Sequence, residues 1–193
     1  ADLDYLGYGI RNHQFNNNKL EGAGGYNEEI TGYVPADLKI FTAKADYVQT
    51  MDDGFKTELG WKSSHINTNN KAEYFLRDGN GTIPDFGKTN HFVYRENIHA
   101  AYLSAQKKWE RWTLQAGLRY ENTSYNANQL GNAIRKDSSF SRSYESLFPT
   151  FTAGFEADSN NSFSFTAGRR IDRPPFHALN PFIFIINKYT YQA

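Results

Sequence analysis

The segment from Trp112 to Glu121 alternates strictly between apolar and polar side chains. One parity holds Trp112, Leu114, Ala116, Leu118 and Tyr120, and the other holds Thr113, Gln115, Gly117, Arg119 and Glu121. Because successive side chains of a strand point to opposite faces, this pattern predicts a strand with one apolar and one polar face. Eight steps of about 3.3 Å span about 26 Å. Tilted by about 40°, such a strand rises about 20 Å, close to the apolar band of a membrane barrel.

Four other segments repeat the alternation less regularly, at residues 41–47, 55–62, 151–157 and 163–168. Aromatic residues make up 16% of the chain, although its mean hydropathy is only −0.71. This combination fits a wall with one apolar face, one polar face and aromatic girdles. The sequence therefore predicts an all-β chain, an antiparallel up-and-down meander that is part of a transmembrane β-barrel. The same composition also fits a soluble β-sandwich that binds sugars by ring stacking.

The connections between these segments alternate in length. Residues 51–54, 108–111 and 158–161 form short polar turns, and polar stretches at about 67–90, 126–143 and 172–181 separate them. Outer-membrane barrels have short periplasmic turns and long extracellular loops. We therefore expect the three long stretches to be loops at one end of the barrel.

Two regions have weaker patterns. Between Glu96 and Trp109 the apolar spacing fits a helix as well as a strand, and the need of the neighbouring strands for an antiparallel partner favours a strand. Residues 1–37 are predicted to be a poorly defined strand and loop region. Within that region, Asn16–Asn18 and Gly22–Gly25 indicate loops.

Several function classes find no support in the sequence. The formal net charge is zero, which gives no electrostatic reason to expect nucleic acid. There is no cysteine, and the five histidines are scattered without metal-ligand spacing. No apolar run is long enough for a transmembrane helix. We predict no catalytic, cofactor-binding or metal-binding residue and therefore no enzyme; paired carboxylates such as Glu58 with Glu121 are the basis of an enzymatic alternative.

Four motifs resemble, in order and spacing, the strands of TonB-dependent receptor barrels that are common in Bacteroidetes, the outer-membrane β-barrel family. They are FVYRENIHAAY from Phe92 to Tyr102, WTLQAGLRYENT from Trp112 to Thr123, LFPT from Leu147 to Thr150, and GRRIDRPPFHALNPF from Gly168 to Phe182. The resemblance covers roughly residues 38–193, which we take as the barrel segment. It implies an internal barrel fragment without the plug domain, from a receptor whose complete barrel has about 22 strands.

The resemblance also implies a location and partners. We expect the bacterial cell outer membrane, contact with its lipid, a nutrient ligand, and partnership with TonB and a plug domain. The alternative is a small complete β-barrel or soluble sandwich that binds carbohydrate or serves in adhesion.

Strand parity assigns candidate residues to the two faces. The candidates for the lumen or the ligand are Glu58, Arg119, Glu121, Arg169, Arg170 and Arg173. The candidates for the membrane face are Trp61, Trp112, Leu114, Leu118, Tyr120, Phe163 and Phe165. The three clustered arginines also fit a structural role at a strand end, bonding to loop carbonyl groups.

Overall fold

The computed structural model describes residues 1–78, 81–171, 184–187 and 190–192, with the side chains of 78, 184–187 and 190–192 left undescribed. The strands are β1 Asp2–Leu20, β2 Tyr26–Thr50, β3 Phe55–Asp78, β4 Gly81–Pro84, β5 Asn90–Trp109, β6 Trp112–Leu130, β7 Ser138–Glu156, β8 Ser162–Gly168, β9 Phe184–Asn187 and β10 Thr190–Gln192. In these ranges no helix is long and apolar enough to cross a membrane.

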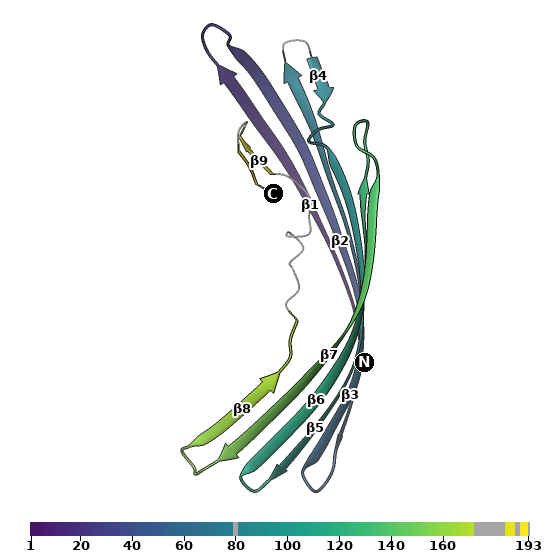
Figure 1. The fold of residues 1–193 in the computed structure, drawn as a ribbon, viewed down its shortest axis with the longest axis vertical. Helices are drawn as coiled ribbons and strands as arrows, with labels where there is room; N and C mark the ends of the chain where they lie inside the picture. Colours follow the sequence, from purple (N-terminus) through teal and green to yellow (C-terminus); the bar gives the residue numbers. More distant parts are fainter. Residues whose placement is uncertain (79–80, 172–183, 188–189, 193) are drawn as a thin grey trace.

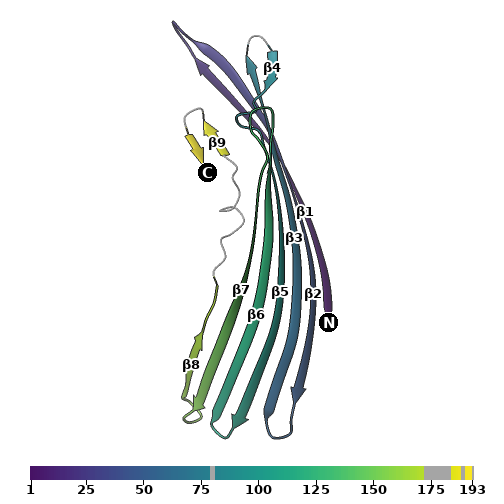
Figure 2. The same cartoon turned by 45° about the vertical axis from the view of Figure 1, so that its right-hand side comes forward.

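Strands β1 to β8 form one long, bowed sheet (Figures 1 and 2). Its order is β1-β2-β3-β5-β6-β7-β8, every neighbour is antiparallel, and β4 pairs with the end of β3. Strands β9 and β10 pair with each other in a separate sheet. This arrangement confirms the predicted all-β antiparallel meander. Within the described residues the sheet is open, with β1 and β8 at its edges.

Tight turns join the strands at the lower end of the sheet in Figure 1. At the first, Gly54 has a positive φ of 79° and its amide donates to the Met51 carbonyl over 3.1 Å. At the third, the Asp158 carboxylate accepts the backbone amides of Asn160 and Asn161. The predicted short turns are thus confirmed, because Gly tolerates positive φ and Asp side chains satisfy free turn amides.

The predicted long loops are wrong over most of their length. Strand β3 continues to Asp78 and β5 begins at Asn90, while β6 continues to Leu130 and β7 begins at Ser138. The connections shrink to residues 79–89, which include β4, and 131–137. These stretches have a polar composition but keep a two-residue alternation, so they extend the strands. The stretch predicted at 172–181 lies outside the described residues.

The N-terminal region is also more regular than predicted. Asn16, Asn17 and Asn18 belong to β1 and pair with Ile30, Glu29 and Glu28, so they are not a loop. Residues 22–25 form the hairpin turn, as expected. Strand β2 runs through positions 37 and 38 without a break, across the predicted boundary of the barrel segment. The ambiguous segment from 96 to 109 is a strand and forms most of β5.

The pairing register is continuous over the whole length of the central strands. Strand β3 pairs with β5 from Phe55↔Lys107 to Ala72↔Asn90 without a shift, and β5 with β6 and β6 with β7 pair in the same way. A one-residue slip would exchange the faces of every side chain beyond it. Because there is no slip, the parity of a residue fixes its face from one end of a strand to the other.

All buried side chains of the described strands share one face, which we call the inner face. They are Ile30, Thr68, Asn70, Ala72, Tyr74, Asn90, Phe92, Tyr94, Ala100, Glu121, Thr123, Ala127 and Phe148. The opposite side is the outer face. Side chains crowd together on the hollow side of a curved sheet and spread apart on the other, which accounts for this one-sided burial.

Two glycines admit tyrosine rings on the inner face. Gly32 pairs with Tyr74 and Gly60 pairs with Tyr102 across neighbouring strands. A Cβ atom at Gly32 would lie 2.5 Å from Tyr74 Cε1, and one at Gly60 would lie 2.2 Å from Tyr102 Cζ. Each ring therefore lies over a position that only glycine leaves free, as in other sheets where an aromatic side chain covers a cross-strand glycine.

Candidate functional site: the two halves of the inner face

The outer face is apolar only in its lower half, towards the tight turns. The band comprises Leu59, Trp61, Ala101, Leu103, Trp112, Leu114, Ala116, Leu118, Tyr120, Leu147, Phe151, Phe163 and Phe165. Most of the large members are exposed, from 40% for Tyr120 to 67% for Phe163. Every predicted membrane-face residue lies in this band. Directly above it the outer face becomes polar, beginning with Ser63, His99 and Asn122.

The lower half of the inner face is polar and charged. Lys44 pairs with Asp46 over 2.6 Å, Arg119 Nε pairs with Glu121 over 2.6 Å, and Lys56 pairs with Glu58 over 2.6 Å. In each pair the partners are two residues apart, the spacing that puts both on one face of a strand. Here the predicted lumen residues Glu58, Arg119 and Glu121 share the inner face.

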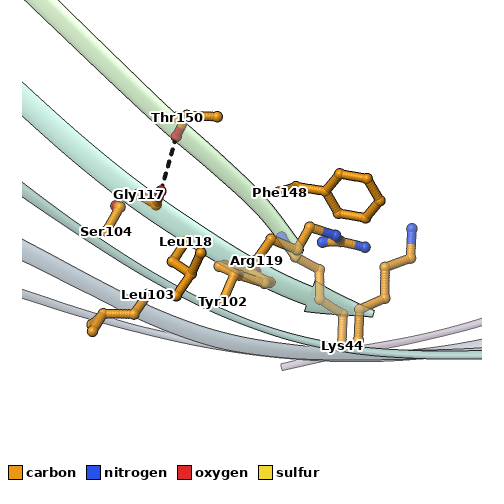
Figure 3. Close-up of a pocket in the computed structure, with 10 residues that line it drawn as sticks. Lys44, Tyr102, Leu103, Ser104, Gly117, Leu118, Arg119, Phe148 and Thr150 are labelled. Atoms are coloured by element: carbon orange, nitrogen blue, oxygen red, sulfur yellow. Dashed lines mark hydrogen bonds between the residues drawn. The ribbon is translucent and has the colours of Figure 1, made fainter. Parts of the chain in front are cut away.

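Tyr102 connects these ion pairs across the strands. Its hydroxyl donates to the Asp46 carboxylate, and the Arg119 guanidinium carbon lies 5.7 Å from the centre of its ring. Figure 3 shows the side chains of Lys44, Arg119 and Phe148 rising from the same side of the sheet. They line a shallow cavity of about 390 Å³. Lys44 and Arg119 have carboxylate partners, whereas Lys62, which also lines this cavity, has no ion pair in the described part of the chain.

The predicted arginine group does not act as a unit in the described part of the chain. The Arg169 amide donates to the Pro149 carbonyl over 3.0 Å, and its guanidinium donates to the Leu147 carbonyl over 3.3 Å. These contacts are those expected of a structural residue at a strand end. Arg170 is exposed, and Arg173 lies outside the described residues.

The carboxylates Glu58 and Glu121 do not form a catalytic pair. Strand β5 lies between their strands, and Glu121 stands four positions from Gly117, the β6 residue in line with Glu58. With about 4.8 Å between strands and about 3.3 Å per residue, their backbones are roughly 16 Å apart. Glycosidase carboxylates lie about 5–10 Å apart. The geometry therefore gives this enzymatic alternative no support.

The upper half of the inner face has the opposite character. Ile30, Ala72, Tyr74, Phe92, Tyr94 and Ala127 form the buried apolar cluster of the sheet, with Val34, Leu76 and Tyr125 packed against it. Tyr94 is only 5% exposed, and its ring centre lies 5.8 Å from that of Tyr125. Burial raises the pKa of the Tyr94 hydroxyl, and the nearby Glu96 carboxylate raises it further. Both causes keep this hydroxyl protonated.

A groove of about 880 Å³ opens on this half of the inner face. We call it the upper groove; it is lined by Tyr8, Ile10, Ala36, Asp37, Leu38, Ile40, Ile66, Thr68, Asn70, Tyr94, Glu96, Ile98, Tyr125, Arg142 and Tyr144. Its volume lies in the range of small-molecule sites, and its mainly apolar lining with few polar groups is typical of them. Asp37, Glu96 and Arg142 bring two acidic groups and one basic group into this lining.

Two buried polar side chains of the upper groove lack partners within the described residues. Thr68 and Asn70 are 5% and 3% exposed, and Thr68 Oγ1 and Asn70 Nδ2 have no hydrogen-bond partner there. An unsatisfied buried polar group costs about 1–3 kcal/mol. Such groups are the exception in native structures and call for a partner. They are therefore natural contacts for whatever fills the groove.

The sequence analysis missed the upper groove, although a signal for it was present. In β3 the alternation continues from Ile66 through Ala72 and Tyr74, but the apolar parity is now even, whereas Leu59 and Trp61 are odd. With an unbroken register, such a change of parity moves the apolar side chains to the inner face. Reading the stretch as a loop hid this change.

The model of the outer membrane protein beta-barrel family matches residues 1–193. Among solved structures, the ferric citrate transporter FecA in the unliganded form has a TM-score of 0.46 and 14% identity, over 81% of this chain and 23% of that chain. The ferric yersiniabactin uptake receptor FyuA from Yersinia pestis has a TM-score of 0.46 and 11% identity, over 82% and 24%. This chain thus spans about a quarter of either structure. No curated protein sequence matches it.

Proposed function

Since this chain belongs to the outer membrane protein β-barrel family and lies in the bacterial outer membrane, we propose that it forms part of the wall of a TonB-dependent receptor for nutrient uptake. The four sequence motifs support the Bacteroidetes type of this receptor. In this proposal the outer face contacts lipid and the inner face lines the passage. Energy reaches the receptor through TonB acting on a plug domain.

The observation that carries this proposal is the exposed apolar band of the outer face. Complete burial of a large apolar side chain is worth about 1.5–3 kcal/mol. The band leaves ten such side chains about half exposed, including Leu118, Phe163 and Phe165. In water their exposure would forfeit roughly 10 kcal/mol, comparable to the whole stability of a domain. A lipid environment removes this penalty, so the band argues against the alternative of a soluble sandwich.

The upper groove is the part of the wall that we assign to the nutrient. It lies beyond the lipid-facing band, at the end opposite the tight turns, and in outer-membrane barrels that end is extracellular. A ligand arriving from outside therefore meets the groove before the charged lower wall. Thr68, Asn70, Glu96 and Arg142 would orient it while the aromatic rings contact its apolar surface.

Uptake tests this proposal most directly. A strain that lacks the protein carrying this chain is grown on ferric siderophores, oligosaccharides, peptides or cobalamin as the limiting nutrient. We expect growth on one of these classes to fail and to return with the restored gene, and the return to require TonB. Restored growth in a TonB-deficient background would contradict the proposed energy source. If all four nutrients supported equal growth in the deletion strain, nutrient uptake would be contradicted.

Lipid contact is tested separately by spin labels at single cysteines. Labels replacing Leu114 or Leu118 should be reached by a lipid-soluble relaxing agent, and labels replacing Thr113 or Gln115 by a water-soluble one. Water access at Leu114 and Leu118 would refute the membrane orientation whatever the nutrient is.

A further inference from the structure

Directly above the apolar band, nine polar side chains form a grid of three strands by three positions on the outer face. Strand β3 contributes Ser63, His65 and Asn67, β5 contributes Arg95, Asn97 and His99, and β6 contributes Asn122, Ser124 and Asn126. We call this grid the polar belt. It faces away from the upper groove, so it has no part in the proposed nutrient contacts.

Hydrogen bonds within the polar belt fix two histidine rings and leave each a free nitrogen. Ser63 Oγ lies 2.9 Å from His99 Nδ1, and His65 Nδ1 lies 2.5 Å from Asn97 Oδ1. His99 Nδ1 can accept from the Ser63 hydroxyl, which leaves Nε2–H to donate to an external acceptor, whereas His65 Nδ1 donates to the Asn97 carbonyl oxygen, so its Nε2 donates only when both ring nitrogens carry a proton. Both histidines are exposed. The rings are thus held in place on an accessible surface.

The charges of the polar belt have one sign. Arg95 is exposed, and none of the nine positions carries a carboxylate. Lys39 of β2 lies in line with Asn67 and Arg95 and adds a second cation. The nearest acidic residue in the same rows is Glu145 of β7, which pairs with Asn122 at the far side of the belt. The surface therefore offers two cations and many hydrogen-bond donors to an anion.

The position of the polar belt indicates which kind of anion it meets. Its lowest row follows immediately after Trp61, Ala101 and Tyr120, the upper edge of the lipid-facing band. Aromatic girdles of barrels lie at the membrane interface. The next residues outward therefore stand at the level of the lipid headgroups, on the extracellular side.

We propose that the polar belt binds the phosphate groups of lipid headgroups in the outer leaflet of the outer membrane. Arg95 supplies charge-assisted hydrogen bonds, while His99 Nε2 and the asparagine amides donate further ones. Continuity with the lipid-facing band and the one-signed charge both favour a lipid over a protein partner. The inference rests on the membrane orientation of the outer face but not on nutrient uptake.

The test measures lipid bound to the full-length protein in detergent micelles. Lipid A, a phosphorylated acylated disaccharide, is titrated and the bound fraction is counted by native mass spectrometry. The wild-type protein should bind lipid A more tightly than lipid A from which the phosphates have been removed. Arg95→Gln should weaken binding about fivefold, since one cation near an anionic surface is worth about 1 kcal/mol. The double variant His65→Gln and His99→Gln should also weaken it.

The matched control is Arg77→Gln, on the same face of β3 but twelve residues beyond His65, and it should bind as the wild type does. Heat-modifiable gel migration shows whether each variant is folded, and the histidine variant provides an independent reading if Arg95→Gln does not fold. Equal binding of dephosphorylated lipid A, or unchanged binding in both variants, overturns the proposal. Full competition by inorganic phosphate overturns the assignment to lipid in favour of a small-anion site.

Discussion

The lower and upper halves of this sheet are built by the same strands and have opposite polarity. In the lower half the outer face is apolar and the inner face carries ion pairs such as Arg119–Glu121. In the upper half the outer face is polar and the inner face holds the apolar cluster around Tyr94. The comparison shows that alternation alone specifies a strand, whereas the parity of the apolar residues specifies which side meets lipid, water or ligand.

The strongest test of this contrast places one charge on the outer face at two heights. In β6, Ala116→Arg puts a cation in the apolar band, and Ser124→Arg puts it in the polar belt. A cation at the membrane midplane costs about 2–4 kcal/mol, and near the interface about 0–1 kcal/mol. Unfolding by urea in lipid vesicles, followed by heat-modifiable gel migration, should show the difference. Equal losses at the two positions would mean that the band is not in lipid.

The next test places a charge on the inner face at two heights. Ile66→Lys puts an ammonium group into the upper groove, and Ser146→Lys puts one in line with Glu121 in the polar lower half. We expect Ile66→Lys to reduce nutrient-dependent growth rate at limiting concentration at least about tenfold, since a lost 1.4 kcal/mol of binding is a factor of ten. Ser146→Lys should leave it unchanged. The amount of protein in the outer membrane must be equal for both variants.

A third test uses the glycine–tyrosine pairs that occur in both halves. Gly32→Ala and Gly60→Ala both force a tyrosine ring to move, whereas a Cβ at Gly154 meets nothing closer than 3.8 Å. Overpacking costs about 1–3 kcal/mol. We expect the largest loss at Gly32, because Tyr74 is buried in the apolar cluster, a smaller loss at Gly60, and almost none at Gly154. The midpoints of urea unfolding measure the three losses of stability. A larger loss at Gly60 than at Gly32 would contradict the expectation that Tyr74 is the more tightly packed ring.

The smallest expected effect is on the pH dependence of stability, which should differ between His91 in the upper half and Asp53 at the first tight turn. Burial and Lys71 hold the pKa of His91 below its ordinary value, so the unfolded chain takes up a proton first as the pH falls below about 6.5. This part of the stability is present above that pH and is lost on acidification towards the lowered pKa.

The lower turn should respond only in stronger acid. The hydrogen bond from Lys107, followed by the Phe55 amide, holds the pKa of Asp53 below its ordinary value. That contribution is present above about pH 3.9 and is lost as the pH falls through the lower folded value. Unfolding temperatures are measured at pH 7.5, 5.5 and 3. The drop between pH 7.5 and 5.5 should be smaller in His91→Gln than in the wild type, and the drop between pH 5.5 and 3 should be smaller in Asp53→Asn. An unchanged drop between pH 7.5 and 5.5 in His91→Gln would assign it to another group.

The sequence was most informative where composition and alternation agreed. In β6 the apolar parity from Trp112 to Tyr120 predicted the strand, its two faces and the neighbouring turns. It failed where polar composition masked an alternation of the opposite parity, as in Asn67, Asn69 and Lys71, which alternate with inner-face residues of the upper groove. Loop composition and strand periodicity conflict there, and cross-strand pairing decides in favour of the strand.

The candidate site could be predicted only in part for a related reason. Parity puts Arg119 and Glu121 on one face of β6, but the contact of Arg119 with Tyr102 of β5 depends on the register. Thr68 and Asn70 carry no motif, and only their burial without partners distinguishes them. A single sequence gives side-chain parity, whereas the upper groove requires the alignment of six strands.

The unshifted ladder between β3, β5, β6 and β7 constrains how such a protein can change during evolution. Point substitutions alter one position of one surface, and insertions at the hairpin tips alter nothing below them. A single inserted or deleted codon inside a strand would turn the remainder of that strand inside out, presenting the ion pairs to hydrocarbon and the aromatic rings to the medium. Descendants of this chain should therefore differ inside their strands by even numbers of residues, or by single residues accompanied by a bulge that restores the phase.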